Sequence, residues 1–202
     1  MVEYRKLPGW KKINPYTRAE IILVSEGVKP GATSGDFNEE LLISTLERLD
    51  IYHTEPERIE SKGKVKITVT YAKLKSDFDA VTYEEGKGVE KHDVDEGHRA
   101  LGKFYGYPKC CVDQYVEDKK NSRTSRFVEK MKELIEKEGE YPEELEYLVP
   151  SMTPCDPKCP DTLKTLRTWK ETLEKHDPDA AKALRRFNKK WLEEYLEKNL
   201  SK

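Results

Sequence analysis

The sequence predicts an α+β protein that is predominantly helical, with a small antiparallel β-hairpin or sheet in its N-terminal half. Two observations lead to this fold class. Over most of the chain, apolar residues recur at the spacing of three to four that one face of a helix requires. Between Ile51 and Tyr83 the period changes to two, which is typical of strands with one buried face.

Two helices are expected before this stretch. Asn14 and Pro15 supply a cap and a first-turn proline for the first helix, and Gly27 ends it. Asp36 with Glu39 three residues later forms a capping box, so the second helix is expected to begin there and to continue through a run of leucines. The glycine-rich segment between the two helices lacks the phosphate-loop pattern and is interpreted as a connecting loop.

The clearest strand lies in the middle of the period-two stretch. Val65, Ile67, Val69 and Tyr71 alternate with polar residues, as a half-buried strand requires. Gly63 precedes them and is placed to turn a hairpin. These residues predict the antiparallel pairing at the centre of the small sheet.

The C-terminal half is predicted to be helical. A helix is expected from Asp93 to Gly106, another after Pro108, a third around Met131, a short turn after Pro142, and two more after residue 160. Four prolines within eleven residues exclude helix and central strand before the penultimate helix, and they predict a rigid loop: Pro150, Pro154, Pro157 and Pro160.

The chain length favours one domain over residues 1–202. Within it, residues 1–92 are expected to form the helix pair and the small sheet. Residues 93–202 form the helical part that carries all four cysteines. Nothing in the sequence predicts an oligomeric state.

Charge and hydropathy exclude several classes of function. The 37 basic and 39 acidic residues leave a formal net charge of -2, so no overall field attracts nucleic acid, and nucleic-acid binding is not expected. The basic stripe on the last predicted helix is balanced by glutamates. No apolar run suits a signal peptide or a membrane span, which predicts a cytoplasmic protein without a membrane partner. Abundant Lys and Glu beside a single glutamine are typical of thermophilic proteins.

The four cysteines are the strongest indication of function. Cys110 and Cys111 fall in the first turn of a predicted helix, where unpaired backbone donors and the helix dipole favour thiolates. Their acidity is therefore expected to be raised. Cys159 directly precedes a proline and takes the cap position of the next helix, with Cys155 four residues before it. Because both pairs lie at helix starts, we treat the four cysteines as one candidate site.

A metal site is the first interpretation of this arrangement. Four thiolates suit tetrahedral zinc or an iron–sulfur cluster, with Cys110, Cys111, Cys155 and Cys159 as ligands. His98, on the preceding helix, is a candidate to replace one of them. The spacings of zero and three intervening residues depart from the two that zinc knuckles normally use.

Three other interpretations remain open from the residues alone. In a binding or scaffold protein, one or two disulfides would join the two clusters, as happens in intracellular proteins of hyperthermophiles. A bond between the adjacent Cys110 and Cys111 is not expected, because it would distort the peptide between them. In a thiol-redox protein, one of these two would be the nucleophile, and Cys155 or Cys159 would resolve the mixed disulfide. Finally, the four could be unconnected buried cysteines.

The cysteine motifs also carry a family resemblance. The segment from His98 to Val112, with its Gly-Tyr-Pro-Lys-Cys-Cys core, and the later Pro-Cys-Asp-Pro-Lys-Cys-Pro resemble an archaeal family known only as a domain of unknown function. The resemblance is specific at these motifs and weak through the sheet region. It implies that both cysteine clusters belong to one signature, and it brings no established activity, so whether the protein is an enzyme stays open.

Overall fold

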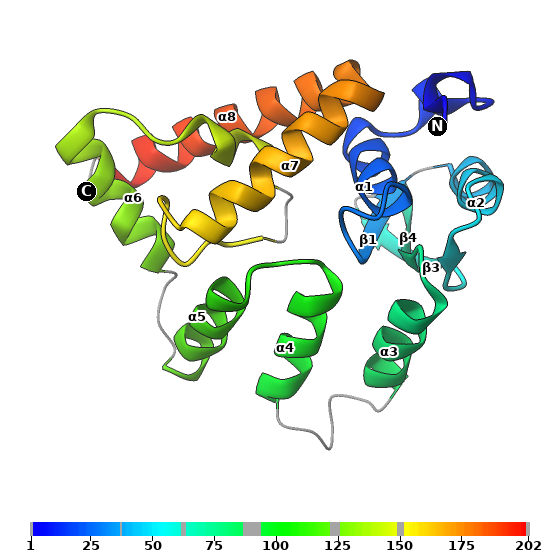
Figure 1. The fold of residues 1–202 in the computed structure, drawn as a ribbon, viewed down its shortest axis with the longest axis horizontal. Coiled ribbons are helices and arrows are strands. Elements are labelled where there is room, and N and C mark those ends of the chain that lie inside the picture. The colour runs from blue at the N-terminus through cyan, green and yellow to red at the C-terminus, as the bar shows by residue number, and fades with distance from the viewer. Residues whose placement is uncertain are drawn as a thin grey trace.

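The computed structural model describes residues 2–36, 38–61, 64–86, 94–121, 126–148 and 152–200 (Figure 1). In the N-terminal half of this described part, the elements are η1 (Tyr4–Lys6), η2 (Trp10–Lys12), α1 (Pro15–Ser25), β1 (Gly31–Asp36), α2 (Glu39–Arg48), β2 (Tyr52–His53), β3 (Glu57–Ser61), β4 (Lys64–Ala72) and α3 (Lys75–Gly86). They are followed by α4 (Val94–Phe104), α5 (Lys109–Lys120), α6 (Arg126–Glu138), η3 (Glu143–Tyr147), α7 (Pro160–His176) and α8 (Pro178–Leu200). The predicted fold class, mostly helical with a small antiparallel sheet in the N-terminal half, is confirmed.

The sheet is built around β4. β1 pairs with β4 on one side, from Gly31 opposite Ala72 to Asp36 opposite Ile67, and β2 and β3 pair with β4 on the other side. All these pairings are antiparallel. Ile67, Val69 and Tyr71 are buried, which confirms the predicted alternation for these three residues. The side chain of Val65, and Gly63 with the expected turn, lie outside the described part of the chain.

Helix α1 lies between the sheet and the two C-terminal helices, α7 and α8 (Figure 1). Its apolar run Ile21–Val24 is fully buried, as expected of a helix that has packing partners all round. Asn14 caps it by accepting a hydrogen bond from the backbone N–H of Tyr16, and Pro15 occupies the first turn. The predicted start of this helix is therefore confirmed.

Strand β1 corrects the expectation of a connecting loop between the first two helices. Its sequence, Gly-Ala-Thr-Ser-Gly-Asp, has none of the large β-branched or aromatic residues that mark most strands. The small side chains allow it to pack against α1, and cross-strand bonds between hydroxyl groups take the place of apolar pairs. Thr33 Oγ1 lies 2.9 Å from Thr70 Oγ1, and Ser34 Oγ lies 2.9 Å from the Tyr71 hydroxyl.

Two further expectations in this region are wrong. The cap of α2 is Asn38, whose side chain accepts from the Leu41 N–H, while Asp36 ends β1 and accepts from the backbone N–H of Asn14 instead. The period-two stretch also ends at β4, since Lys75–Gly86 forms α3. Phe78 of this helix packs against the small apolar cluster of Ala72 and Phe104.

The helical half resembles the expectation closely. α4 ends at Phe104 before Gly106, whose φ of +70° is the left-handed conformation that favours glycine. The expected start of α4 at Asp93 lies outside the described residues. Acidic η3 lies against α7 and α8, to which it is joined by the pairs Arg167–Glu144 at 2.7 Å and Arg185–Glu146.

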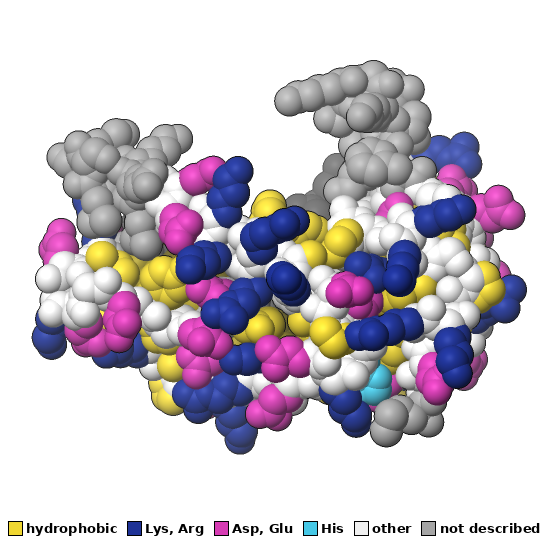
Figure 2. All heavy atoms as spheres, turned by 90° about the horizontal axis from the view of Figure 1, so that it is seen from above, with side chains coloured by type: hydrophobic (Ala, Val, Ile, Leu, Met, Phe, Trp, Pro, Cys, Tyr) yellow, Lys and Arg dark blue, Asp and Glu magenta, His cyan; other side chains and the backbone are white. Residues whose placement is uncertain are grey.

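Figure 2, a view from above Figure 1, shows basic and acidic side chains interspersed over the exposed surface on this side. Such a surface has no large area of one charge sign on the part that the figure shows. Among the residues that the structure describes, no helix combines the length and apolar composition that crossing a bilayer requires.

The contact between α4 and α5 is very close at Gly102. A Cβ atom on Gly102 would lie 2.4 Å from Val112 Cγ2, whereas one on Gly97 of the same helix would meet nothing within 4 Å. We therefore expect Gly102→Ala to lower the free energy of unfolding by about 1–3 kcal/mol through overpacking. Gly97→Ala, the matched control, should raise it by about 0.5–1 kcal/mol through helix propensity. Urea denaturation checks both, and equal effects of the two variants would contradict the close packing.

Candidate metal centre

Two helix starts and one loop supply the four cysteines. Pro108 is the N-cap of α5, so Cys110 and Cys111 lie in its first turn, as predicted. Cys159 is the N-cap of α7, with Pro160 directly after it, again as predicted. The loop between Cys155 and Cys159 is folded into a tight turn in which the Cys159 N–H donates to the Asp156 carbonyl at 3.0 Å.

The four sulfur atoms form a compact group. All of them lie within 4.8 Å of one another. The Cys110 sulfur is 3.5 Å from that of Cys159 and 3.9 Å from that of Cys111. All four thiols are free, so none of the disulfides considered from the sequence is present. The inference that the two clusters meet in space is therefore confirmed.

Polar groups around the cluster are directed at the sulfur atoms. The Thr162 hydroxyl lies 3.0 Å from the Cys111 sulfur, and the backbone N–H of Cys155 donates to the same sulfur at 3.4 Å. The Cys110 thiol faces Asp161 Oδ2 at 3.8 Å. The Cys155 N–H stabilises negative charge on the Cys111 sulfur, and hydrogen bonds of this kind orient metal-binding thiolates, whereas Asp161 accepts from the Cys110 thiol.

The cysteines differ in their acidity. Burial, together with the neighbouring Cys159 and Cys111, raises the pKa of Cys110 to about 12. Burial and the adjacent Cys111 also raise the pKa of Cys155. Burial by itself would raise the pKa of Cys159, but hydrogen bonds from the Thr162 side chain and backbone and from two cysteines lower it to about 7.

This pattern corrects the expectation that the first turn of α5 makes Cys110 acidic. The helix start is present, yet a second thiolate beside an ionised one is disfavoured by repulsion between like charges in a partly buried site. The pKa of Cys159 is lowered, whereas the pKa values of Cys110 and Cys155 are raised. A cation at the centre of the group would relieve this repulsion.

The sulfur atoms are unequally accessible. Cys111 and Cys159 are buried, Cys155 is half-buried, and Cys110 is exposed. Lys130 of α6 holds the loop from the outside, because its ammonium group donates to the Cys155 carbonyl at 3.2 Å and pairs with Asp156 at 3.0 Å. The cluster thus lies near the surface, between α5, α7 and a loop fastened to α6.

His98 lies on α4 and is not one of the side chains in the compact sulfur group. Its ring packs edge-on against Tyr115, with 5.2 Å between the ring centroids. It shares the lining of a cavity with Cys111. Its role as a replacement ligand stays a prediction.

Sequence reasoning missed the residues that support the sulfurs. Thr162 follows the N-cap Cys159 by three residues, and the side chains at these two positions face each other at a helix start, so the spacing alone could have indicated it. Asp161 and Lys130 carried no comparable signal, because their roles depend on how α5, α6 and α7 pack together.

A comparison with protein families identifies the family of the chain. Residues 62–186, which include both cysteine motifs, match the family described as "Protein of unknown function (DUF483)". The comparisons with curated proteins and with solved structures gave no match. The expected kinship with a domain of unknown function is confirmed, and the chain belongs to the family of unknown function DUF483.

Proposed function

We propose that this protein holds one metal ion, zinc in the first place, on Cys110, Cys111, Cys155 and Cys159, and that this ion joins α5 and α7. The observation that carries the proposal is the mutual approach of all four sulfur atoms to within 4.8 Å. Four side chains from two helix starts and a loop meet at one point, which chance placement of unconnected cysteines does not explain.

The spacing of the sulfurs supports a single ion. A Zn–S bond of about 2.3 Å in a tetrahedron places neighbouring sulfurs about 3.8 Å apart. The separations of 3.5 Å and 3.9 Å from Cys110 to Cys159 and to Cys111 bracket this value. In an iron–sulfur cube each thiolate binds a different iron, so its ligands stand farther apart. The geometry therefore favours one tetrahedral ion over a cluster.

The surroundings also suit four thiolates around a dication. The donors at the starts of α5 and α7 and the Cys155 N–H offset part of the surplus negative charge of such a centre, while Lys130 fixes the loop through the Cys155 carbonyl and pairs with Asp156. Four protein ligands leave no open position for a substrate, which is the arrangement of structural zinc sites. The proposed role of the ion is thus to hold the helical half together.

A thiol-redox function is the second candidate, and one observation favours it. The Cys159 thiol has a pKa lowered to about 7 by its hydrogen bonds, and the exposed Cys110 lies only 3.5 Å away. In this function a Cys159 thiolate attacks a substrate disulfide, forming a mixed disulfide and releasing one substrate thiolate. Cys110 then displaces the second substrate thiol and leaves a Cys110–Cys159 disulfide on the protein. This candidate requires the thiols to be free of metal in the working protein.

Elemental analysis with a parallel count of free thiols tests the proposal, on protein purified without oxygen or chelator. We expect one zinc ion per chain, four thiols that react only after a chelator is added, and loss of the zinc in Cys155→Ser. Four freely reactive thiols without metal would support the redox candidate instead. Fewer than four thiols without metal would point to structural disulfides in a binding or scaffold protein.

A further inference from the structure

A cleft runs along α5 on the side of Cys111. It consists of two adjoining cavities, of about 290 Å³ and 170 Å³, that share three lining residues: Cys111, Tyr115 and Thr153. The larger one approaches the size of small-molecule pockets, which begin at roughly 300 Å³. Cys111 brings the cleft directly against the candidate metal centre.

The larger cavity has mainly ring and aliphatic walls. Tyr105, Tyr107, Tyr115 and His98 line it together with Leu101 and Val112. Flat rings pack well against tyrosine and histidine rings, by stacking or by edge contacts. This cavity therefore suits the planar, apolar part of a ligand.

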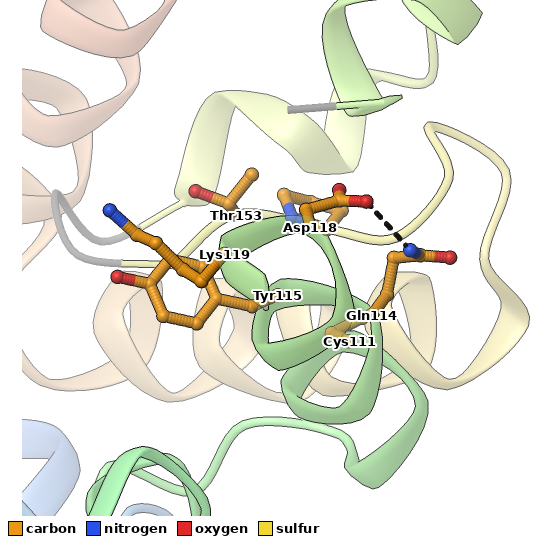
Figure 3. A pocket seen from close by; sticks show the side chains of 7 residues that line it. Cys111, Gln114, Tyr115, Asp118, Lys119 and Thr153 are labelled. Atoms are coloured by element: carbon orange, nitrogen blue, oxygen red, sulfur yellow. Dashed lines mark hydrogen bonds between the residues drawn. The ribbon is translucent and has the colours of Figure 1, made fainter. Parts of the chain in front are cut away.

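The smaller cavity has more polar side chains in its lining, among them Gln114, Lys119 and Thr153. Figure 3 shows Tyr115 and Lys119 extending side by side from α5, with Thr153 across from them. The ammonium group of Lys119 lies 5.5 Å from the centre of the Tyr115 ring, and Tyr115 is 38 % exposed. Lys119 thus holds a positive charge over a ring that lines both cavities.

Acidic groups in the lining do not cancel this charge. Asp118 is the acidic residue of the smaller cavity, and it is bound by Arg126 at 3.0 Å and by the Gln114 amide at 3.0 Å. Figure 3 shows the contact between Gln114 and Asp118 as a dashed line. Because Arg126 balances Asp118, Lys119 supplies the net charge of the cleft.

We propose that this cleft binds a small aromatic anion, a molecule of one or two fused rings that carries a carboxylate, sulfonate or phosphate group. The rings occupy the larger cavity, and the anionic group lies beside Lys119 and Thr153. The proposal concerns a ligand other than the metal ion, since the cleft is built from α4, α5, Thr153 and Pro154, and Cys111 is the lining residue that belongs to both sites.

The probe for this site is 8-anilino-1-naphthalenesulfonate, an aromatic anion whose fluorescence rises in apolar surroundings. Titration of the full chain as purified is expected to show saturable binding of one probe per chain. Lys119→Glu should weaken binding about tenfold, because it replaces an attraction by a repulsion. Thr153→Trp, at an exposed position, should abolish the saturable binding by filling the cleft. 2-Naphthoate should displace the probe, and acetate at equal concentration should not.

The controls distinguish binding at this site from nonspecific binding of the probe and from effects of the metal centre. Lys182→Glu makes the same charge change at an exposed position that lines neither cavity, and it should leave the affinity unchanged. Metal content is measured in every variant, so failure of the metal proposal is seen independently. Absence of saturable binding, binding unaffected by Lys119→Glu and Thr153→Trp, or equal displacement by acetate would each overturn the proposal.

Discussion

Removal of the ion is expected to lower the melting temperature of this protein by about 8–16 °C. Structural zinc contributes about 10–16 kcal/mol in peptides that fold only with metal. Here most of the core is formed by other contacts, so we expect about 4 kcal/mol, and about 2–4 °C per kcal/mol applies to a chain of this size. Cys111→Ser should have a similar effect, because Cys111 is 3 % exposed and a serine oxygen is a poor replacement for its sulfur. Thermal melts followed by circular dichroism check both expectations.

The control for this prediction combines two changes, the Cys111→Ser substitution and removal of the metal, separately and together. If Cys111 stabilises the fold through the ion, wild type and Cys111→Ser should melt at nearly the same temperature after both are treated with chelator. A difference in melting temperature as large without metal as with it would show that Cys111 acts through packing alone. A wild-type melting temperature that does not respond to the chelator would contradict a structural ion.

The second large effect on stability is expected at Asp177, which follows the end of α7 opposite to Cys159. Its carboxylate is 1 % exposed and accepts from the Trp10 indole N–H at 2.7 Å and from Arg18 at 2.8 Å. It also caps α8 by accepting from the Ala180 N–H at 3.1 Å. Asp177→Asn keeps the size and the capping oxygen but leaves the Arg18 charge buried without compensation.

We expect Asp177→Asn to lower the free energy of unfolding by about 3–5 kcal/mol, which corresponds to about 6–20 °C in melting temperature. Asp179→Asn is the matched control, because Asp179 is exposed in the first turn of the same helix. Its effect should stay below about 1 kcal/mol. Equal effects of the two variants in urea denaturation would show that Arg18 does not depend on Asp177.

The parts of the fold that local chemistry determines were predictable from the sequence. The starts of α1, α5 and α7 follow from Pro15, Pro108 and Pro160, since proline limits where a helix can begin. The placement of the cysteines at two of these starts predicted that they would form one group. Their compact arrangement is confirmed by the sulfur positions.

The failures lie where tertiary contacts override local cues. The small residues of β1 favour a loop. It forms a strand because all six of its residues pair with β4, and because small side chains allow it to pack closely against α1. Asp36 resembles a helix cap in sequence, yet the fold uses its carboxylate to bind the Asn14 N–H. The acidity of Cys110 was predicted from the backbone donors and dipole of the helix start, without the burial and the neighbouring thiols that raise its pKa.

X-ray absorption at the zinc edge tests the central claim most directly, on the full chain as purified. A centre made of Cys110, Cys111, Cys155 and Cys159 predicts a single shell of four sulfur atoms at about 2.3 Å from zinc, without nitrogen or oxygen. A shell of three sulfurs and one nitrogen would replace one cysteine by a histidine and return attention to His98. Absence of zinc, or a shell of oxygen atoms, would contradict the metal centre.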